Sequence, residues 1–487
     1  MSENNSTRGD MPVDEFRQLG HQMIDWIADY LKNIEQYPVL SQIKPGDVKN
    51  KLPQQPPETG DGLKNIFDDI NNIIMPGITH WNHPGFMAYF NSTASGPGIL
   101  AEFLSAAFNA NGMLWRTCPS STELEQLTLG WLRQMLILPD DYWGIIYDTA
   151  SVSTLHAIAA AREYAGEKFA LRKKGMIGNS APRFRLYCSE QAHSSVDKGA
   201  LTLGIGIDGI RKIAVDEKFR LIPGELKNAI DEDKANGWLP FCVVATIGTT
   251  STTSIDPLDE IAKICNAENI WLHVDAAYGG TAAIVPEMRC ILNGIEHADS
   301  IVVNPHKWMF TPVDLSAFFT RKPDVLKRAF SLVAEYLKTT EQNKVESYMD
   351  YGVQLGRRFR SLKLWFIIRY FGVDGIIERL RFHLKLTQDF AAWIKAHQYF
   401  KQMAPAPLSV ICFRAVLKNK TEDEIDKLNE MLMNNVNSTG KIFLSHTKLH
   451  DRFVIRLAIS GINTKEKHVE LAKTLLDEKL NELKNNG

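Results

Sequence analysis

The spacing of hydrophobic and polar positions divides this chain into three regions. From Asp14 to Ile34, apolar residues recur at steps of three and four, which is the period of an amphipathic helix. The next stretch, 37–62, contains five prolines and can form little core, because proline interrupts helices and sheet ladders. We therefore expect residues 1–95 to form a helical, proline-rich N-terminal arm that lies over another surface, plausibly that of a second subunit.

The middle region, residues 96–362, alternates between short apolar runs and segments of helical length. The runs are nearly continuous, as in strands that are buried on both faces of a sheet. This alternation predicts an α/β fold with a mostly parallel central sheet and helices on both faces. In such sheets, ligands bind at the carboxyl ends of the strands. The predicted strands are 144–147, 184–188, 241–246, 270–274 and 301–303.

One helix of the middle region carries a recognisable start signal. Thr122 and Glu125 have the spacing of a capping box, in which each side chain bonds the backbone of the first turn. Leu127 and Met135 would then belong to the buried face of the helix. We therefore expect a helix that begins next to Thr122.

The last region, residues 363–487, has a different order of predicted helices and strands. It opens with a long apolar helix, and then a strand at 408–416, an acidic helix at 421–433 and a strand at 452–459 follow. This order predicts a small C-terminal α+β domain.

The composition is that of an ordinary folded protein, with 44% apolar residues, 23% charged residues and a formal charge of −2. Such a balance gives no electrostatic reason to expect nucleic acid or a membrane surface as a partner. The six cysteines are scattered, which favours free thiols in a reducing compartment. The N-terminus is polar, and no apolar run is long enough to cross a bilayer. These features predict a cytoplasmic protein.

Two predicted strands end next to residues of opposite charge. Asp275 closes the run 270–274, and Lys307 follows the run 301–303. A lysine forms a Schiff base with an aldehyde if its amine is presented deprotonated in a partly desolvated site. A carboxylate buried at the neighbouring strand end needs a cationic partner, and a protonated pyridine nitrogen is one. Taken singly, a lysine is usually at the surface and an aspartate usually caps a turn, but the pair predicts pyridoxal phosphate.

Further residues at strand ends could complete such a site. Ala150 and Ser151 follow a strand and precede a helix, where free N–H groups bind phosphate. Thr250 offers a hydroxyl, and His193 could stack on a planar ring and bond a substrate carboxylate. Ala277 and the small residues around it would allow a flat ring to approach the backbone. Each feature alone is equally typical of a cap, a turn or a structural histidine.

Two other motifs suggest a different class of protein. Gly204–Gly209 matches G-x-G-x-x-G, but it follows a helical segment and precedes a strand, the reverse of the dinucleotide-binding order. His80 and His83 could bind zinc, although no cysteine or acidic cluster accompanies them. A dinucleotide- or metal-binding protein therefore stays a second hypothesis. Visible cofactor absorbance that is lost on Lys307→Ala would exclude it.

Four motifs stand in a characteristic order: His193–Ser195, His273–Gly280, Asn304–Trp308 and Leu355–Lys363. In this order they resemble the group II pyridoxal-phosphate decarboxylases, and most closely the aromatic-L-amino-acid decarboxylases. The resemblance extends over almost the whole chain. It implies a fold type I homodimer with a helical N-terminal arm, a large cofactor domain and a small C-terminal domain.

The resemblance also implies a role for each candidate of the cofactor site. Lys307 would hold the cofactor aldehyde, Asp275 would pair with the pyridine nitrogen, and His193 would stack on the ring opposite Ala277. Thr250 would lie near the cofactor. The residues that would hold the phosphate are Ala150, Ser151, Asn304 and His306.

The implied aromatic pocket is made of Trp81, Tyr89, Phe90, Asn91, Ser92, Asn111, Met113 and Gly356. Asn111 and Met113 would reach in from the other subunit. Typical animal members have Pro-Thr in place of Asn91–Ser92 and Phe in place of Met113. In plant relatives, glycine at the position of Gly356 accompanies indole substrates, so the resemblance leans toward tryptophan.

The segment 331–352 shows little periodicity and is predicted to be a flexible loop. Its residues Ala334–Lys338 resemble the mobile catalytic loop of the family. Tyr336 would then be the acid that protonates the α-carbon, and related aldehyde-forming members carry Phe there.

The implied activity is decarboxylation of tryptophan, phenylalanine, tyrosine or dihydroxyphenylalanine to the arylalkylamine and CO2. Aldehyde formation coupled to decarboxylation, or aminotransfer, is the alternative.

Overall fold

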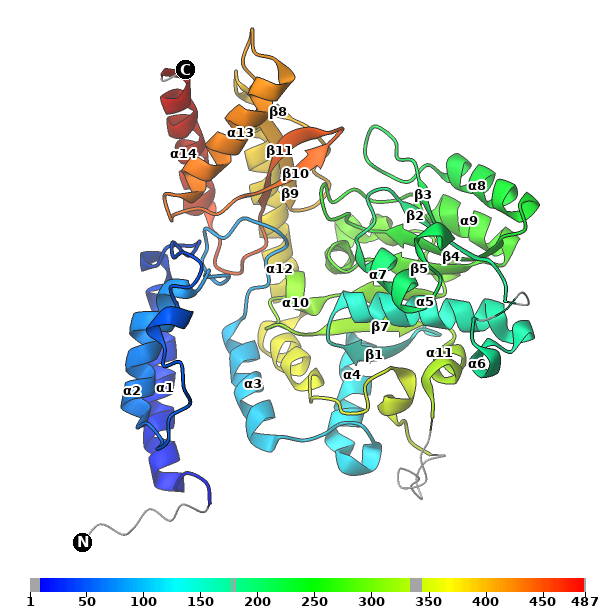
Figure 1. The fold of residues 1–487 in the computed structure, drawn as a ribbon, viewed down its shortest axis with the longest axis horizontal. Helices are drawn as coiled ribbons and strands as arrows, with labels where there is room; N and C mark the ends of the chain where they lie inside the picture. The colour runs from blue at the N-terminus through cyan, green and yellow to red at the C-terminus, as the bar shows by residue number, and fades with distance from the viewer. Residues whose placement is uncertain (1–8, 177, 179–180, 333–343, 486–487) are drawn as a thin grey trace.

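The computed structural model describes residues 9–176, 178, 181–332 and 344–485 (Figure 1). The helices are α1 Val13–Lys32, α2 Leu63–Asp69, α3 Gly96–Phe108, α4 Pro119–Met135, α5 Ala150–Gly166, α6 Leu171–Lys174, α7 Ser195–Thr202, α8 Pro223–Ala235, α9 Leu258–Glu268, α10 Pro305–Trp308, α11 Pro323–Phe330, α12 Ser361–Ala396, α13 Glu422–Asn437 and α14 Glu466–Asn485. The strands are β1 Trp143–Tyr147, β2 Phe184–Ser189, β3 Ile210–Ile213, β4 Leu239–Thr246, β5 Trp271–Asp275, β6 Ser300–Val303, β7 Ser316–Thr320, β8 Phe400–Gln402, β9 Val410–Ala415, β10 Ser445–Leu449 and β11 Arg452–Ala458.

A seven-stranded sheet forms the centre of the molecule, in the order β1-β7-β6-β5-β4-β2-β3. Strands β6, β5, β4, β2 and β3 are parallel to their neighbours in this series, whereas β7 is antiparallel to both β1 and β6. The predicted α/β fold with a mostly parallel sheet is therefore confirmed. Strand β7 was not predicted, and its place is set by antiparallel pairing with two strands that are distant in sequence.

Helices cover both faces of this sheet (Figure 1). In β4, Cys242 and Val244 belong to a core that includes α5, whereas Val243 and Ala245 belong to the core that includes α8 and α9. Successive side chains of a strand point to opposite faces, so a continuous apolar run fills both layers. This is why the buried strands could be predicted from their sequence.

Helix α4 begins at Pro119, before the predicted start, so the capping-box prediction is wrong. Thr122 and Glu125 are both buried, and Glu125 forms an ion pair with Arg357. Leu127, which was predicted to be buried, is 46% exposed. Glu125 points into the protein because it pairs there with Arg357, which comes from a distant segment of the chain. The local sequence pattern around Glu125 gives no sign of this partner.

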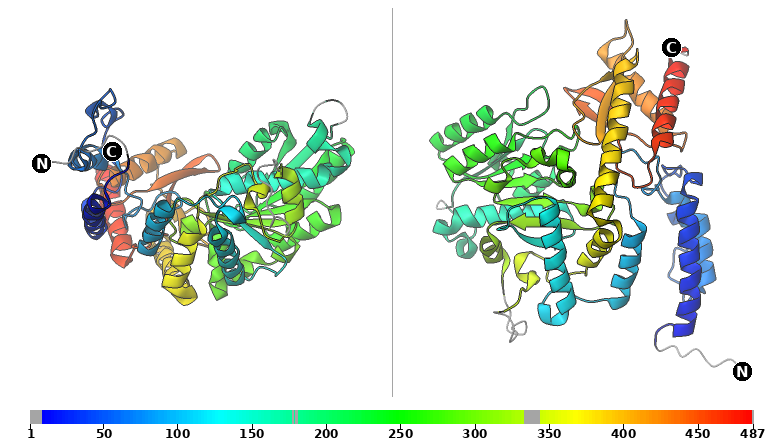
Figure 2. Two further views of the ribbon diagram at one scale, coloured as in Figure 1. Left: turned by 90° about the horizontal axis from the view of Figure 1, so that it is seen from below. Right: turned by 180° about the vertical axis from the view of Figure 1, so that it is seen from behind.

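The C-terminal part forms a second sheet, in the order β10-β11-β9-β8, with antiparallel pairs throughout. Segment α12 consists of two helices joined at a kink, where Gly372 has a non-helical backbone, and it runs from the large sheet to this small one, as the rear view in Figure 2 shows. It packs against α3 and α4 at one end and against β8 and β9 at the other. The helix thereby ties the two sheets together.

The N-terminal helices α1 and α2 lie side by side and extend away from both sheets (Figures 1 and 2). Within the described chain, α1 buries none of its residues, and Phe16 is 56% exposed. The apolar stripe read from the sequence is thus present but only partly covered in this single chain, since Phe16 is exposed whereas Ile34, just beyond the helix, is buried. Among the described residues, no helix has the length and apolar character that a membrane span requires.

Candidate active site

The carboxyl ends of β4, β5 and β6 bring polar residues from distant segments together. Thr246 ends β4 and pairs in register with Asp275, the last residue of β5. Asn304 directly follows β6 and donates its backbone N–H to the carbonyl of Ala277 at 3.0 Å. The short helix α10 then carries Lys307 back over this edge. Because neighbouring parallel strands end on the same side, residues far apart in sequence converge here.

A cavity of about 180 Å³ opens at this edge. All nine residues predicted to bind the cofactor line it: Ala150, Ser151, His193, Thr250, Asp275, Ala277, Asn304, His306 and Lys307. The structure therefore gathers in one place what the sequence distributes over 158 positions, from 150 to 307. The other residues of its wall are Phe90, Thr149, Thr246, Gly248 and Tyr278.

The amine of Lys307 lies in a desolvated setting. Burial lowers its pKa below the ordinary value, and the nearby Arg456 guanidinium lowers it further, whereas the Asp275 carboxylate acts in the opposite direction. The Nζ atom also lies 5.1 Å from the centre of the Phe90 ring. A lowered pKa increases the fraction of neutral amine, which is the form that attacks an aldehyde.

His193 is held by the start of α7. Its Nδ1 accepts a hydrogen bond from the Ser195 backbone N–H at 3.1 Å, and the Ser195 hydroxyl lies 2.9 Å from the same atom. Since Nδ1 is an acceptor, the neutral ring carries its proton on Nε2. Burial lowers the pKa of His193, so the neutral form is favoured near pH 7.

The first turn of α5 forms another part of the cavity wall. This helix starts at Ala150, earlier than the sequence suggested, so Ala150 and Ser151 occupy its N-terminal positions. The first N–H groups of a helix have no intrahelical acceptor and favour a bound anion. His306 lies nearby in α10, and its Nδ1 accepts the backbone N–H of Leu315 at 3.0 Å.

Two buried atoms of the cavity wall have no hydrogen-bond partner among the described residues: Thr246 Oγ1 and Asn304 Oδ1. Unsatisfied buried polar atoms are costly and usually mark a site for a ligand or water. A ligand with a phosphate, an aldehyde and a ring nitrogen would match the helix start, Lys307 and Asp275. Pyridoxal phosphate has all three groups, so the residues present fit this cofactor.

Sequence reasoning gave no role to three residues around the site, which are Tyr278, Trp308 and Arg456. Phe90 stacks on Tyr278 with ring centres 3.8 Å apart, and Tyr278 stacks on Trp308 at 4.9 Å. Behind Phe90 lies Arg456, whose guanidinium carbon is 4.7 Å from the ring centre. Arg456 is buried in β11, and a charged residue inside an apolar strand was the available signal.

The glycines after Asp275 act differently from the prediction. Ala277 lines the cavity, but a Cβ on Gly279 would lie 2.4 Å from the carbonyl oxygen of Ile247. A Cβ on Gly280 would lie 2.7 Å from a methyl group of Val303. Both glycines thus allow this turn to pack against neighbouring strands and do not face the cavity.

The predicted substrate residues fall into separate groups. In the described part of the chain, Phe90 is the one member that lines the cavity. Trp81 and Tyr89 stack on each other near Phe86, and Asn91 and Ser92 follow them in sequence. Asn91 is buried and donates to the Phe86 carbonyl at 3.3 Å.

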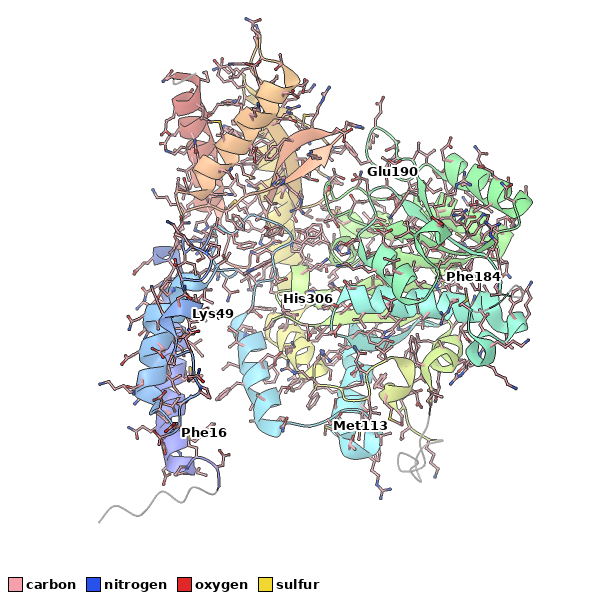
Figure 3. All side chains as sticks on the ribbon, viewed as in Figure 1. Phe16, Lys49, Met113, Phe184, Glu190 and His306 are labelled. Atoms are coloured by element: carbon pink, nitrogen blue, oxygen red, sulfur yellow. The ribbon has the colours of Figure 1, made fainter. Side chains whose placement is uncertain are left out.

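Asn111, Met113 and Gly356 form another group. The Asn111 side chain accepts the backbone N–H of Met113 at 3.2 Å, and a Cβ on Gly356 would lie 3.6 Å from its Nδ2. Figure 3 shows Met113 toward the lower edge of the molecule, whereas His306 lies near the middle. Within one chain, this group does not reach the cavity.

The catalytic tyrosine implied by the resemblance, Tyr336, lies outside the described residues. The chain that follows, Tyr348–Tyr351, forms a buried 3-10 turn. The backbone carbonyl of Tyr351 accepts a hydrogen bond from Tyr147, at the end of β1. This part of the predicted loop segment therefore rests on the large sheet.

The glycine motif Gly204–Gly209 lies between the end of α7 and the start of β3. This order contradicts a dinucleotide-binding turn, which requires a strand followed by a helix. His80 bonds to the Tyr30 hydroxyl at 2.9 Å, and His83 accepts the Gly85 N–H at 2.9 Å. Among the described residues, no cluster of three or more potential metal ligands is present.

The fold and the cavity together define a fold type I pyridoxal-phosphate enzyme. Comparison with known proteins narrows this class. The model of the pyridoxal-dependent decarboxylase conserved domain matches residues 45–416. Tryptophan decarboxylase 2 of Oryza sativa subsp. japonica is 40% identical, with 96% of this chain and 94% of that protein covered.

Two further comparisons point to the same family. Phenylacetaldehyde synthase of Arabidopsis thaliana is 38% identical, with 98% of each chain covered. The crystal structure of Oryza sativa TDC with PLP and tryptamine superposes with a TM-score of 0.94 at 33% identity, covering 98% of this chain and 100% of that one. The chain belongs to the pyridoxal-dependent decarboxylase family, and it is a carboxy-lyase that uses pyridoxal phosphate.

Proposed function

We propose that the enzyme converts aromatic L-amino acids to the corresponding arylalkylamines and CO2. The observation that carries this proposal is the buried Lys307 amine, placed near Asp275 with the Phe90 ring as part of the same cavity wall. The relative named above for tryptophan decarboxylation, and the structure with tryptamine, support an aromatic substrate. Tryptophan, phenylalanine, tyrosine and dihydroxyphenylalanine are the candidate substrates.

Each wall of the cavity has a separate task in this proposal. The first turn of α5, with Asn304 and His306, holds the cofactor phosphate, and Asp275 holds the pyridine nitrogen protonated. Bound pyridoxal phosphate supplies an electron sink for the electron pair that remains when CO2 leaves. Lys307 would hold the cofactor through its aldehyde, and its amine would be the group that releases the product.

Protonation of the product requires an acid near the α-carbon. We assign this role to Tyr336, acting directly or through His193, on the resemblance of Ala334–Lys338 to the catalytic loop of the family. The Nε2 proton of His193, fixed by the bond from Ser195 to Nδ1, suits a relay at this position. Protonation of the α-carbon thus decides whether the product is the amine or an aldehyde.

The aldehyde alternative has a specific basis, since one relative is named phenylacetaldehyde synthase. With dissolved O2 as the oxidant, Tyr336→Phe should divert product from amine toward aldehyde, with release of ammonia and H2O2, because the residue that supplies the proton is removed. Product identification by chromatography with mass detection tests this. An unchanged amine yield from Tyr336→Phe would refute the assignment of the acid.

We further propose that the enzyme is a homodimer with its active sites at the interface. Leu100, Phe103 and Phe108 on α3 are each about half exposed, and α1 leaves its apolar stripe only partly covered. Large exposed apolar patches mark interaction sites. A second copy would cover them and bring its Asn111, Met113 and Gly356 toward the cavity, which those residues do not reach within one chain. In the dimer, Gly356 and Asn111 of one subunit would therefore approach the cavity of the other subunit together.

The division into an arm (1–95), a cofactor domain (96–362, with the catalytic loop at about 331–352) and a small domain (363–487) remains part of the proposal. Limited proteolysis followed by mass spectrometry would test these boundaries. A cytoplasmic location is proposed on the six cysteines, all of which are free in the described chain.

The deciding experiment measures CO2 release from a panel of amino acids, with identification of the amine. The holoenzyme should show visible absorbance from its cofactor, and Lys307→Ala should abolish both this lysine-dependent absorbance band and turnover. Lys322→Ala, which alters a lysine that pairs with Asp299, serves as the control. Release of keto acid without CO2 would favour aminotransfer instead.

A further inference from the structure

A buried ion pair lies outside the cavity and has no part in the chemistry described above. The Nη2 of Arg357 is 2.7 Å from Oε1 of Glu125, and their side chains are 7% and 1% exposed. Charges taken out of water are costly to maintain, and their net stabilising effect is small or negative. In some proteins a buried pair of this kind holds a particular geometry, and removing one partner leaves an unpaired buried charge.

Both partners are bonded to the large sheet. Oε1 of Glu125 accepts the backbone N–H of Ile146 at 2.8 Å, and Nη2 of Arg357 donates to the carbonyl of Ile146 at 2.8 Å. Ile146 lies in β1, which leads into the first turn of α5. The ion pair is therefore anchored on a rigid element at the phosphate end of the cofactor site.

The backbone of Arg357 holds the group of predicted substrate residues. Its N–H donates to the Asn111 side-chain oxygen at 3.0 Å, and its carbonyl accepts the N–H of Gly112 at 2.8 Å. The same Asn111 oxygen accepts the Met113 N–H, and Gly356 directly precedes Arg357. We call Asn111–Met113 together with Gly356 the side-wall. Its two segments meet at Arg357, whose guanidinium is hydrogen-bonded to β1.

We propose that Glu125 and Arg357 are positioning residues for recognition of the aromatic side chain: their ion pair sets where the side-wall stands. This inference rests on the proposed function, in which Asn111, Met113 and Gly356 contact the substrate ring. The side-wall segments are loops, with no strand ladder of their own to fix them.

The test variant is Glu125→Gln, assayed as the dimeric holoenzyme. The amide keeps an oxygen that can accept the Ile146 N–H, but it removes the charge that holds Arg357. We expect KM for tryptophan to rise about tenfold with kcat and cofactor absorbance nearly unchanged, because the lost contact is ground-state recognition. Hydrogen exchange should accelerate in peptides that cover 111–113 and 356–357, but not in β4 or β5.

Arg357→Lys provides a second variant. It keeps the charge but loses the fork that reaches Glu125 and the Ile146 carbonyl together, so KM should rise in the same direction. It decides the question if Glu125→Gln fails to fold. The matched control is Arg358→Gln, because Arg358 is the next residue, is 56% exposed and pairs with Glu102 at 2.7 Å. This control should leave KM unchanged.

Two results would overturn the inference. One is an unchanged KM in both variants, and the other is a parallel loss of cofactor absorbance and kcat, which would make the pair a support of the cofactor site. If the wild-type enzyme released no CO2 from any aromatic amino acid, the proposed function would fail. Hydrogen exchange would still decide whether the pair holds the side-wall.

Discussion

At the scale of single residues, the site depends on charges that are placed where water is excluded. Desolvation lowers the pKa of the Lys307 amine, and Asp275 and Arg456 are close enough to shift this pKa in opposite directions. The Asp275 carboxylate also accepts the backbone N–H of Ala277 at 3.1 Å, which orients it toward the cavity. Substitutions here should change chemistry more than folding.

Asp275→Asn keeps an oxygen for the Ala277 N–H but removes the negative charge. We expect kcat to fall by about 10²-fold or more, because the pyridine nitrogen loses the partner that keeps it protonated. Steady-state kinetics on cofactor-saturated enzyme measure this effect. Asp299→Asn, at the opposite end of the sheet, is the control and should retain activity. Near-normal kcat in Asp275→Asn would contradict the assigned role.

Gly356→Ser tests the size of the aromatic pocket. The new side chain fits without a clash, since its Cβ would lie 3.6 Å from Nδ2 of Asn111, but it fills space that a larger ring needs. The ratio of kcat/KM for tryptophan to that for tyrosine should fall by about tenfold or more. Competition assays with both substrates measure the ratio. A ratio that stays constant would remove Gly356 from the pocket.

At the scale of elements, α3 and α1 present apolar faces that the single chain covers only in part. On α3, Leu100, Phe103 and Leu104 recur at three- and four-residue steps and are 38% to 52% exposed. A helix with such a stripe normally packs it against another surface. The same interface would bring the side-wall of one subunit to the cavity of the other, so assembly and activity should be linked.

Phe103→Asp should weaken the dimer. An interface aromatic commonly contributes 2 kcal/mol or more, so the dissociation constant should rise by at least about 30-fold, and activity should fall at low protein concentration. Sedimentation velocity over a concentration series measures both species. Leu201→Asp, on α7 and 51% exposed, is the matched control and should stay dimeric. A monomeric wild-type enzyme with full activity would refute the link.

At the scale of the whole molecule, several buried histidines make stability depend on pH. Burial lowers the pKa of His273, His306 and His383 to about 4. Between pH 6.5 and 4 these histidines are protonated in the unfolded chain but stay neutral in the folded chain. The free energy of unfolding therefore falls as the pH falls. Asp256, whose pKa burial raises to about 6, acts in the opposite direction, because its folded form binds the extra proton.

The three histidines outnumber that aspartate, so the free energy of unfolding should decrease from pH 6.5 to 4, by up to about 1.4 kcal/mol per pH unit for each histidine. Urea denaturation at several pH values measures the slope. His383→Gln should flatten it, since the neutral His383 ring accepts from Trp308 at 3.0 Å. His297→Gln, at an exposed position, should not. Equal slopes in all three proteins would contradict this explanation.

The sequence by itself determined the cofactor chemistry and the α/β fold. Apolar runs of strand length imply a sheet buried on both faces, and parallel strands end on one side, so Asp275 and Lys307 had to meet. Only the tertiary structure decided the partners of Glu125, the place of Arg456 behind Phe90 and the separation of the side-wall from the cavity. Those contacts join segments whose local patterns carry no information about each other, and they form only when the chain is folded.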